Sequence, residues 1–217
     1  MESYPIIVGG KEIFKEKKLD IIYPYNGEKI HSISLAEEED IRGAMEAVKI
    51  AFLKTKKLST HKKTKVLKEI KEKIEKEKEN LAKLIVKEAG KPISQARAEV
   101  ERCIFTFTIA EEEAKRIYGE IVPLDLVPWC EGKEGYVKRF PRGPLLAITP
   151  FNFPLNLVAH KIAPAIAVGI PFILKPSSKT PVVSYKLLKF ILEAGYPEEG
   201  VNFLPMKSEK AKALIEN

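Results

Sequence analysis

The amino-terminal third of the chain changes from strand-like to helical spacing of its hydrophobic residues. Two β-hairpins are predicted first: Ile6–Val8 with Glu12–Phe14 around Gly9-Gly10, and Ile21–Tyr23 with Lys29–Ser34 around Asn26-Gly27. Short apolar runs that flank Gly-containing dipeptides are typical of such hairpins. Ser34 is then expected to cap a helix whose first turn is acidic, because the helix dipole favours negative charge there.

Long amphipathic helices are predicted next. Ser59 or Thr60 is expected to begin a Lys- and Glu-rich helical region that stops at Gly90. Pro92 is expected to open a further helix that closes at Gly119. One apolar stripe of the first region is formed by Leu67, Ile70, Ile74, Leu81 and Ile85.

The stretch Pro123–Pro141 is rich in turn-forming residues and alternates enough for one or two strands. It carries too few apolar residues to cover both faces of such strands. We therefore expect a hairpin or arm that packs against something else, such as another subunit.

From Gly143 onward, apolar strands alternate with helical segments. The strands are predicted in "LLAIT", "IPFILK" and "GVNFLP", and the helices from Pro154 to Val168, from Thr180-Pro181 to Gly195 and in "MKSEKAKALIEN". Strands that are apolar on both faces and alternate with helices indicate an α/β fold, in which flanking helices cover a parallel sheet.

Two isolated polar groups stand in the apolar stretch Ala147–Pro181. Asn152 and Lys175 each follow the carboxyl end of a predicted strand, which is where such sheets bind ligands. The Lys175 ammonium is suited to the ribose or phosphate of a nucleotide, with Ser177 and Ser178 completing a polar lining. The alternatives are structural: a lysine that reaches solvent, serines that cap a helix, and an Asn152 amide bonded to its own turn.

Composition limits the classes of function. The chain has 217 residues, 45% of them hydrophobic, which is enough for one or two domains with a buried core. The net charge of +7 raises the question of nucleic acid, but Lys alternates with Glu at helical spacing, so solvated helix faces are expected instead. No apolar run reaches membrane-spanning length, and the start of the chain lacks a signal-peptide core.

The cysteines and histidines lack the spacing of a metal site. Cys103 falls inside a predicted helix and is expected to be a buried, inert thiol. Cys130 lies in the arm without a nearby His. We expect a reducing, cytoplasmic location, and the abundance of Lys and Glu beside a single Gln, Gln95, suggests a thermophilic habitat.

Neither GxGxxG nor GxxxxGK[ST] is present. The segment "GPLLAITPFNFPLNLVAHKIAPAIAVGIPFILKPSSKTP" nevertheless resembles the aldehyde dehydrogenase superfamily, with its motifs [IT]-P-[WF]-N-[FY]-P, K-x-x-P-A-[LI]-A-x-G and K-P-[SA]-x-x-T-P in order. "YNGEKIHSI", "EAGKPISQARAEVE" and "AGYPEEGVNFLP" are similar to other segments of the same family. The resemblance implies a Rossmann-type NAD(P)-binding domain with a β-hairpin oligomerisation arm.

The resemblance also implies a role for each matching residue. Asn152 matches an amide that stabilises the tetrahedral oxyanion, and Lys175 a lysine that bonds the adenosine ribose. The wall beside the nicotinamide ribose is matched by Ile148, Thr149, Pro150 and Phe151. Phe153 and Leu157 match positions that face the aldehyde pocket. Lys161 matches a lysine sometimes linked to proton movement, for which we expect a structural role.

The family pattern divides the chain into 1–122, the first part of the NAD(P)-binding domain, 123–141, the arm, and 142–217, an incomplete second part. A homodimer or tetramer through the arm is implied. The chain ends at Asn217, before the family's nucleophile loop and general-base segment, and neither cysteine matches the nucleophile. Met206 and Lys207 stand where many members have Gly, which puts a pyrophosphate contact in doubt.

The resemblance therefore implies NAD(P)-dependent oxidation of an aldehyde to a carboxylic acid by the complete enzyme, with the 217-residue chain inactive by itself. The alternative is a non-catalytic binding or assembly module that keeps the fold. Ser178 stands where NAD-preferring members often have Glu, which bonds the ribose 2′-hydroxyl. Without that carboxylate, and with Lys175 and Lys179 nearby, we expect NADP to be accepted at least as well as NAD.

Overall fold

The computed structural model describes residues 2–207, 210, 211 and 215. Its elements in chain order are β1 (Glu2–Tyr4), β2 (Ile6–Val8), β3 (Lys11–Ile13), β4 (Lys18–Ile22), β5 (Lys29–Ser34), α1 (Glu38–Thr55), α2 (Thr60–Lys76), α3 (Lys78–Ala89), α4 (Ile93–Glu113), β6 (Glu120–Pro123), η1 (Pro128–Cys130), β7 (Glu134–Val137), β8 (Leu145–Ile148), α5 (Asn156–Val168), β9 (Phe172–Lys175), α6 (Pro181–Glu193), η2 (Glu198–Gly200) and β10 (Val201–Phe203). The helix expected in "MKSEKAKALIEN" lies largely outside the described residues.

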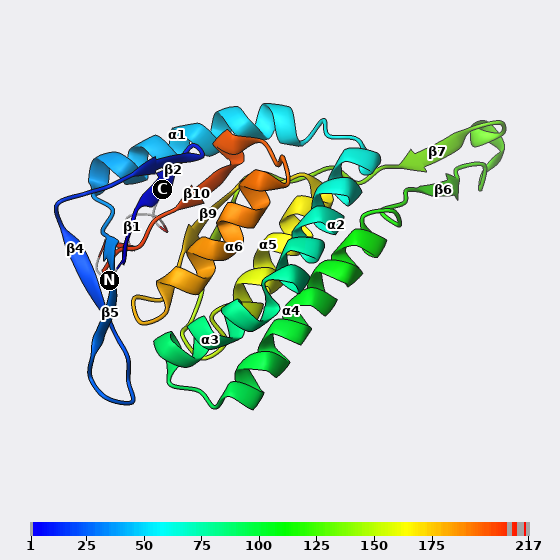
Figure 1. The fold of residues 1–217 in the computed structure, drawn as a ribbon. Helices are drawn as coiled ribbons and strands as arrows, with labels where there is room; N and C mark the ends of the chain where they lie inside the picture. Colours follow the sequence, from blue (N-terminus) through cyan, green and yellow to red (C-terminus); the bar gives the residue numbers. More distant parts are fainter. Residues whose placement is uncertain (1, 208–209, 212–214, 216–217) are drawn as a thin grey trace.

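A five-stranded sheet of order β3-β2-β10-β9-β8 forms the centre of the structure (Figure 1). Strands β8, β9 and β10 run parallel, as predicted. The predicted β2–β3 hairpin pairs antiparallel with the free side of β10, so the sheet is mixed rather than purely parallel. The other predicted hairpin, β4–β5, also forms, and it joins β1 in a separate three-stranded sheet.

Helices cover both faces of the five-stranded sheet. Phe172 and Leu174 of β9 point into the larger core, which lies under α2 to α6, whereas Ile173 between them points into a smaller core under α1. This alternation follows from the two-residue period of a strand, and it explains why β9 is apolar throughout. The predicted apolar stripe of α2 and α3 is buried in the larger core.

Two predicted helix starts need correction. Ser34 does not cap a helix: it is the last residue of β5, and its hydroxyl accepts a hydrogen bond from the Lys15 N–H at 3.1 Å. Helix α1 begins four residues later, where the Asp40 carboxylate accepts from the Glu37 N–H at 2.9 Å. Helix α5 begins at Asn156, two residues after the predicted start at Pro154.

Helix α4 ends at Glu113 rather than at Gly119. Gly119 is required for a different reason, because a Cβ atom there would lie 2.2 Å from the Val137 carbonyl oxygen. The residue therefore marks the close approach of the two chain segments at the base of the arm. By contrast, Ser59 caps α2 and Gly90 ends α3 in the left-handed conformation, as predicted.

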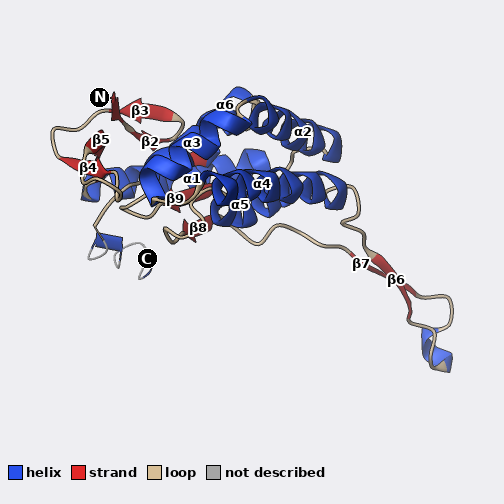
Figure 2. Ribbon diagram, turned by 60° about the horizontal axis from the view of Figure 1, so that its bottom comes forward, coloured by secondary structure: helices blue, strands red, loops and turns tan. Residues whose placement is uncertain are grey.

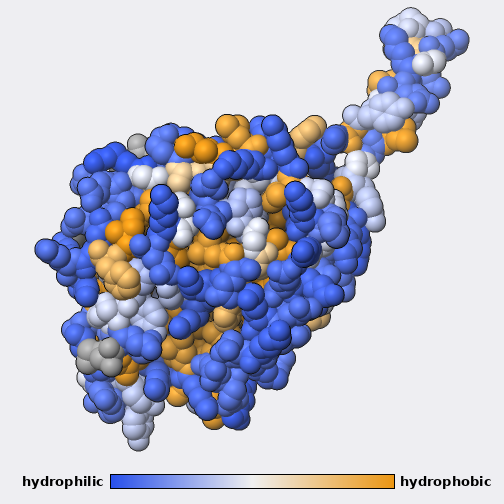
Figure 3. Space-filling view, turned by 45° about the horizontal axis from the view of Figure 1, so that its top comes forward, coloured by the Kyte–Doolittle hydropathy of each residue, from blue (hydrophilic) through white to orange (hydrophobic). Residues whose placement is uncertain are grey.

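The arm is an antiparallel pair, β6 with β7, that extends away from the body of the protein (Figure 2). Its pairing begins at Glu120, three residues before the boundary that the sequence suggested. Leu126 and Trp129 near its tip are 81% and 78% exposed. Apolar side chains also interrupt the hydrophilic surface where the arm leaves the body (Figure 3). Such an exposed apolar hairpin is typical of a segment that is covered by a partner.

The two thiols are expected to differ in reactivity. Cys103 is fully buried in α4, and burial raises the pKa of its thiol, whereas Cys130 lies part-exposed in the arm. Because the thiolate is the reactive form, iodoacetamide should modify only Cys130 in the native chain and both thiols in urea, as measured by mass spectrometry. Native Cys130→Ser should stay unmodified. Equal labelling of Cys103 before unfolding would contradict its burial.

Candidate active and cofactor site

The candidate site lies on two loops at the carboxyl edge of the sheet, residues 149–155 after β8 and residues 176–180 after β9. Ile148 and Lys175 are paired across the two strands. The next residue, Thr149, donates its N–H to the Lys175 carbonyl oxygen at 3.2 Å. The structure therefore brings together the two strand ends from which Asn152 and Lys175 were predicted to face a ligand.

Lys175 is an enclosed cation. Its side chain belongs to a residue that is 7% exposed, and burial lowers the pKa of its ammonium. It takes part in none of the ion pairs found within residues 2–207, 210, 211 and 215. A buried ammonium without a carboxylate partner is costly unless other hydrogen-bond acceptors approach it, so this lysine is suited to receiving oxygen atoms of a ligand.

The second loop has separate roles for its polar residues. The Ser177 hydroxyl accepts a hydrogen bond from the Lys179 N–H at 3.2 Å, so Ser177 stabilises the turn. Ser178, Lys179 and Phe151 line a pocket of about 570 Å³. The Lys179 ammonium lies 4.6 Å from the centre of the Phe151 ring, a cation–π distance, and therefore turns toward the first loop.

The first loop is more open than the sequence suggested. Asn152 is exposed rather than enclosed by apolar side chains, and Ile148, Pro150 and Phe151 are exposed as well. Phe153 is half-buried because the Lys91 ammonium covers its ring at 3.9 Å from the centre. On α5, Leu157 is half-buried and Lys161 is exposed.

A buried carboxylate that the sequence analysis missed holds the first loop in place. One Glu99 oxygen accepts from the N–H groups of Leu155 and Asn156 at 2.9 and 3.2 Å, at the start of α5. The other oxygen lies 2.6 Å from the Lys91 ammonium. Lys91 thus binds Glu99 and covers Phe153 at the same time.

A second buried carboxyl group holds the second loop. The oxygens of Glu88, at the end of α3, accept from the N–H groups of Val182 and Val183 at 2.7 and 2.8 Å, in the first turn of α6. Burial raises the pKa of Glu88 to about 8, although both hydrogen bonds act in the opposite direction. Glu88, Lys91 and Glu99 all lie in "EAGKPISQARAEVE", so the signal that could have revealed them was the motif itself.

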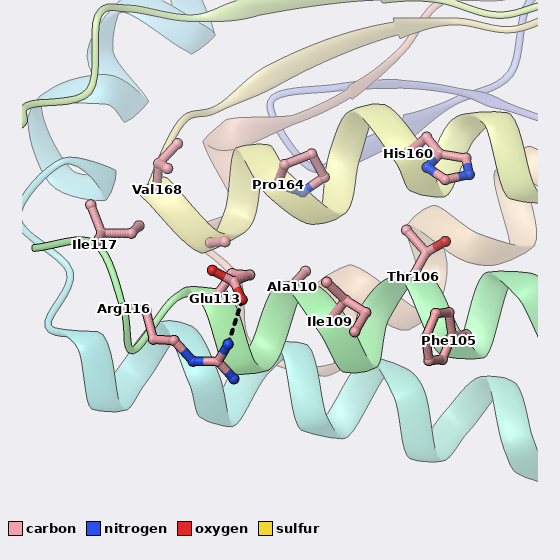
Figure 4. Close-up of a pocket in the computed structure, with 11 residues that line it drawn as sticks. Phe105, Thr106, Ile109, Ala110, Glu113, Arg116, Ile117, His160, Pro164 and Val168 are labelled. Carbon is pink, nitrogen blue, oxygen red and sulfur yellow. Dashed lines mark hydrogen bonds and ion pairs between the residues drawn. The ribbon is translucent and has the colours of Figure 1, made fainter.

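An apolar groove of about 430 Å³ runs between α4 and α5, lined by Phe105, Ile109, His160 and Pro164 among others (Figure 4). At one end of it, Arg116 donates to Glu113 at 2.7 Å. His160 lies three residues beyond Leu157 on α5, so the helix face that carries Leu157 continues into this groove.

Within the described part of the chain, no group of three His, Cys, Asp or Glu side chains is arranged to hold a metal ion. None of the described helices combines the length and apolar character needed to cross a membrane.

Glu88 should make stability depend on pH. Between its ordinary value of 4.5 and about 8, the folded protein holds one proton more than the unfolded chain. The contribution of this group to the free energy of unfolding therefore falls as pH rises, by at most about 1.4 kcal/mol per pH unit. Urea denaturation should show a flatter pH dependence for Glu88→Gln over this window. The exposed Glu101→Gln should keep the parent's slope, and equal slopes for Glu88→Gln and the parent would contradict the assignment.

Comparisons with known proteins show the family and the fold. A sequence profile of the aldehyde dehydrogenase family matches residues 13–217. Aspartate-semialdehyde dehydrogenase 1 of Pseudomonas canavaninivorans is 38% identical over 200 residues, 92% of this chain and 43% of that protein. Aldehyde dehydrogenase 21 from Physcomitrella patens, solved with the reaction product succinate, gives a TM-score of 0.92 at 38% identity, over 97% of this chain and 44% of that one.

A solved NADP-dependent glyceraldehyde-3-phosphate dehydrogenase from Bacillus halodurans C-125, complexed with NADP, gives a TM-score of 0.90 at 28% identity, over 95% of this chain and 44% of that one. The chain thus spans less than half the length of these relatives. The family match begins at Ile13, the last residue of β3, and extends through both site loops and β10. The chain belongs to the aldehyde dehydrogenase family, of which it represents the amino-terminal half.

Proposed function

We propose that this chain is the cofactor-binding half of an NAD(P)-dependent enzyme that oxidises an aldehyde to a carboxylic acid. The observation that supports the proposal is the pairing of β8 with β9, because the loop that carries Asn152 then starts beside the backbone of the largely buried Lys175. The alternative, a non-catalytic binding or assembly module, does not account for a buried cation without a carboxylate partner at this edge of the sheet.

In this proposal Lys175 donates hydrogen bonds to the adenosine ribose, and Ser177 and Ser178 line the same region. The wall beside the nicotinamide ribose is formed by Ile148, Thr149, Pro150 and Phe151. The exposed side chains of this wall become buried when the cofactor binds. The nicotinamide, when bound, supplies the hydride acceptor. The Asn152 amide N–H donates to the oxyanion of the tetrahedral intermediate, where a fixed donor stabilises charge as it develops.

The aldehyde is expected to approach past Phe153 and Leu157, and the groove along α5 extends that apolar surface. The thiolate nucleophile and the general base belong to the family's second half, since Cys103 is buried in a helix and Cys130 lies in the arm. The 217-residue chain by itself is therefore proposed to be inactive. Lys161 is exposed and keeps its proposed structural role.

The proposal includes a homodimer or tetramer formed through the arm, supported by the exposed side chains of Leu126 and Trp129. It also includes a cytoplasmic location, supported by two free cysteines. A thermophilic habitat is supported by ion pairs that share a partner, as in Lys15 with both Glu39 and Asp40.

Asn152→Ala tests the catalytic assignment in the protein that carries both family halves. The substitution should lower kcat by about 10²–10³-fold, the usual loss for one oxyanion donor. The KM for the cofactor should hardly change, because Asn152 does not contact it in this proposal. Steady-state assays of NAD(P)H formation give kcat and the KM for the cofactor. An unchanged kcat would contradict the catalytic assignment and leave Asn152 with a structural role in its turn.

Ser178→Glu tests the proposed choice of cofactor in the same protein. The parent should use NADP at least as well as NAD, because Lys175 and Lys179 offer positive charge and Ser178, unlike a Glu at this position, does not repel the 2′-phosphate. The Glu variant should shift kcat/KM toward NAD by about tenfold or more, and Ser178→Ala should not. A parent that prefers NAD by 100-fold, or a ratio unchanged by Glu, would show that this position does not set the choice.

A further inference from the structure

A strongly basic pocket of about 480 Å³ lies at the base of the arm, far from the site loops. It is formed by the ends of α1 and α4, the start of α2 and the segment that returns from the arm. We call it the basic pocket; six cations line it, namely Lys56, Lys63, Lys115, Lys138, Arg139 and Arg142. No Asp or Glu is among the described residues that line it.

Most of these cations lack an acidic partner. Lys115 lies 3.4 Å from Glu111, and Arg139 lies 3.2 Å from Glu120. Among residues 2–207, 210, 211 and 215, the other four cations take part in no ion pair. The Lys63 ammonium is also partly buried, and this burial lowers its pKa. Convergence of like charges in a hollow is unfavourable unless an anion balances it.

The start of α2 adds to the positive potential. Its N-terminal N–H groups carry the positive end of the helix dipole, which usually attracts acidic residues. Helix α1 follows this rule with Glu38, Glu39 and Asp40 in its first turn. Helix α2 has no acid there and carries Lys62 and Lys63 instead. The Ser59 hydroxyl caps this start by accepting from the Lys62 N–H, but it brings no negative charge, so the positive end of the helix dipole adds to the charge of the neighbouring cations.

The walls of the basic pocket indicate what kind of anion fits. Ile117, Val168 and Ile170 contribute apolar surface, and Phe140 contributes a ring that is 74% exposed. Lys and Arg together are typical of phosphate recognition. A volume of this size holds a small organic molecule rather than a single inorganic ion.

We propose that the basic pocket binds a small phosphorylated metabolite, with its phosphate on Lys63 and Arg142 and its organic part against Phe140 and the apolar wall. This site is distinct from the cofactor site. Helix α5 begins beside the Asn152 loop and ends at Val168, which lines the basic pocket, so the helix separates the two sites. Its 13 residues correspond to about 20 Å.

The position also connects the ligand to the arm. Lys138 and Arg142 bracket the segment by which β7 returns to the body, whereas Lys56 and Lys63 belong to the body itself. A phosphate that contacts both groups fixes the arm's direction relative to the body. The ligand therefore stabilises one orientation of the arm. As a result, the concentration of the ligand affects how readily the arm binds its partner.

Isothermal titration calorimetry on the purified chain tests the site, with fructose 1,6-bisphosphate and pyrophosphate as probes and glucose as the neutral comparison, all at one ionic strength. Both phosphates should bind saturably at millimolar concentration or below, and the sugar phosphate more tightly because it also meets the apolar wall. Glucose should not bind. Lys63→Gln and the exposed Arg142→Gln should each weaken binding about tenfold, the usual effect of losing one charged hydrogen bond.

The matched control is Lys68→Gln, which removes the same charge from the exposed face of α2; among the residues that the structure describes, Lys68 pairs with Glu72 alone. It should bind like the parent. Lys175→Met distinguishes this site from the cofactor site, and it should leave phosphate binding unchanged even if the proposed function fails. The proposal is overturned by absent binding of both phosphates, by equal weakening in Lys68→Gln, or by loss of binding in Lys175→Met alone.

Discussion

Two buried carboxyl groups fix the geometry on which the candidate site depends. A helix start leaves backbone N–H groups without partners, and a buried carboxyl group is costly unless it is hydrogen-bonded. Glu99 and Glu88 resolve both problems at once, because they accept from the first N–H groups of α5 and α6. The loop that carries Asn152 ends where Glu99 binds the backbone, and the loop that carries Ser178 ends where Glu88 does. These two carboxyl groups therefore fix the ends of both loops.

This arrangement also explains why the familiar glycine-rich fingerprints are missing. In many parallel α/β proteins a phosphate binds at the helix start that follows a strand. Here the starts of α5 and α6 are already occupied by protein carboxyl groups. At these two turns a ligand is therefore left to side chains, and the largely buried Lys175 is suited to that purpose. Glycines that let a backbone approach a pyrophosphate would have no use in these two turns.

Local rules predicted the hairpins, the apolar stripe of α2 and α3, the parallel direction of β8 to β10 and the edge at which β8 and β9 end side by side. They failed where the role of a residue depends on a contact with a residue that is distant in the sequence. Gly119 looked like a helix end, yet it serves the contact with Val137, and Ser34 bonds a backbone group nineteen positions earlier in the chain. The buried glutamates looked like any other acids of a charged helix, since nothing in helical spacing distinguishes a carboxylate that faces another helix start.

The same limit applies to charge. Along α2, lysines pair with glutamates one helical turn away, as in Lys65 with Glu69. The sequence therefore suggests that positive and negative charges compensate each other. This i,i+4 pairing of opposite charges requires a helix and is lost beyond the helix ends. The cations of the basic pocket come mostly from segment ends and from the return of the arm, and Lys115 is the one of the six that pairs with an acid one helical turn away, Glu111. Part of the excess charge of +7 therefore gathers in one hollow, even though it is dispersed along the chain.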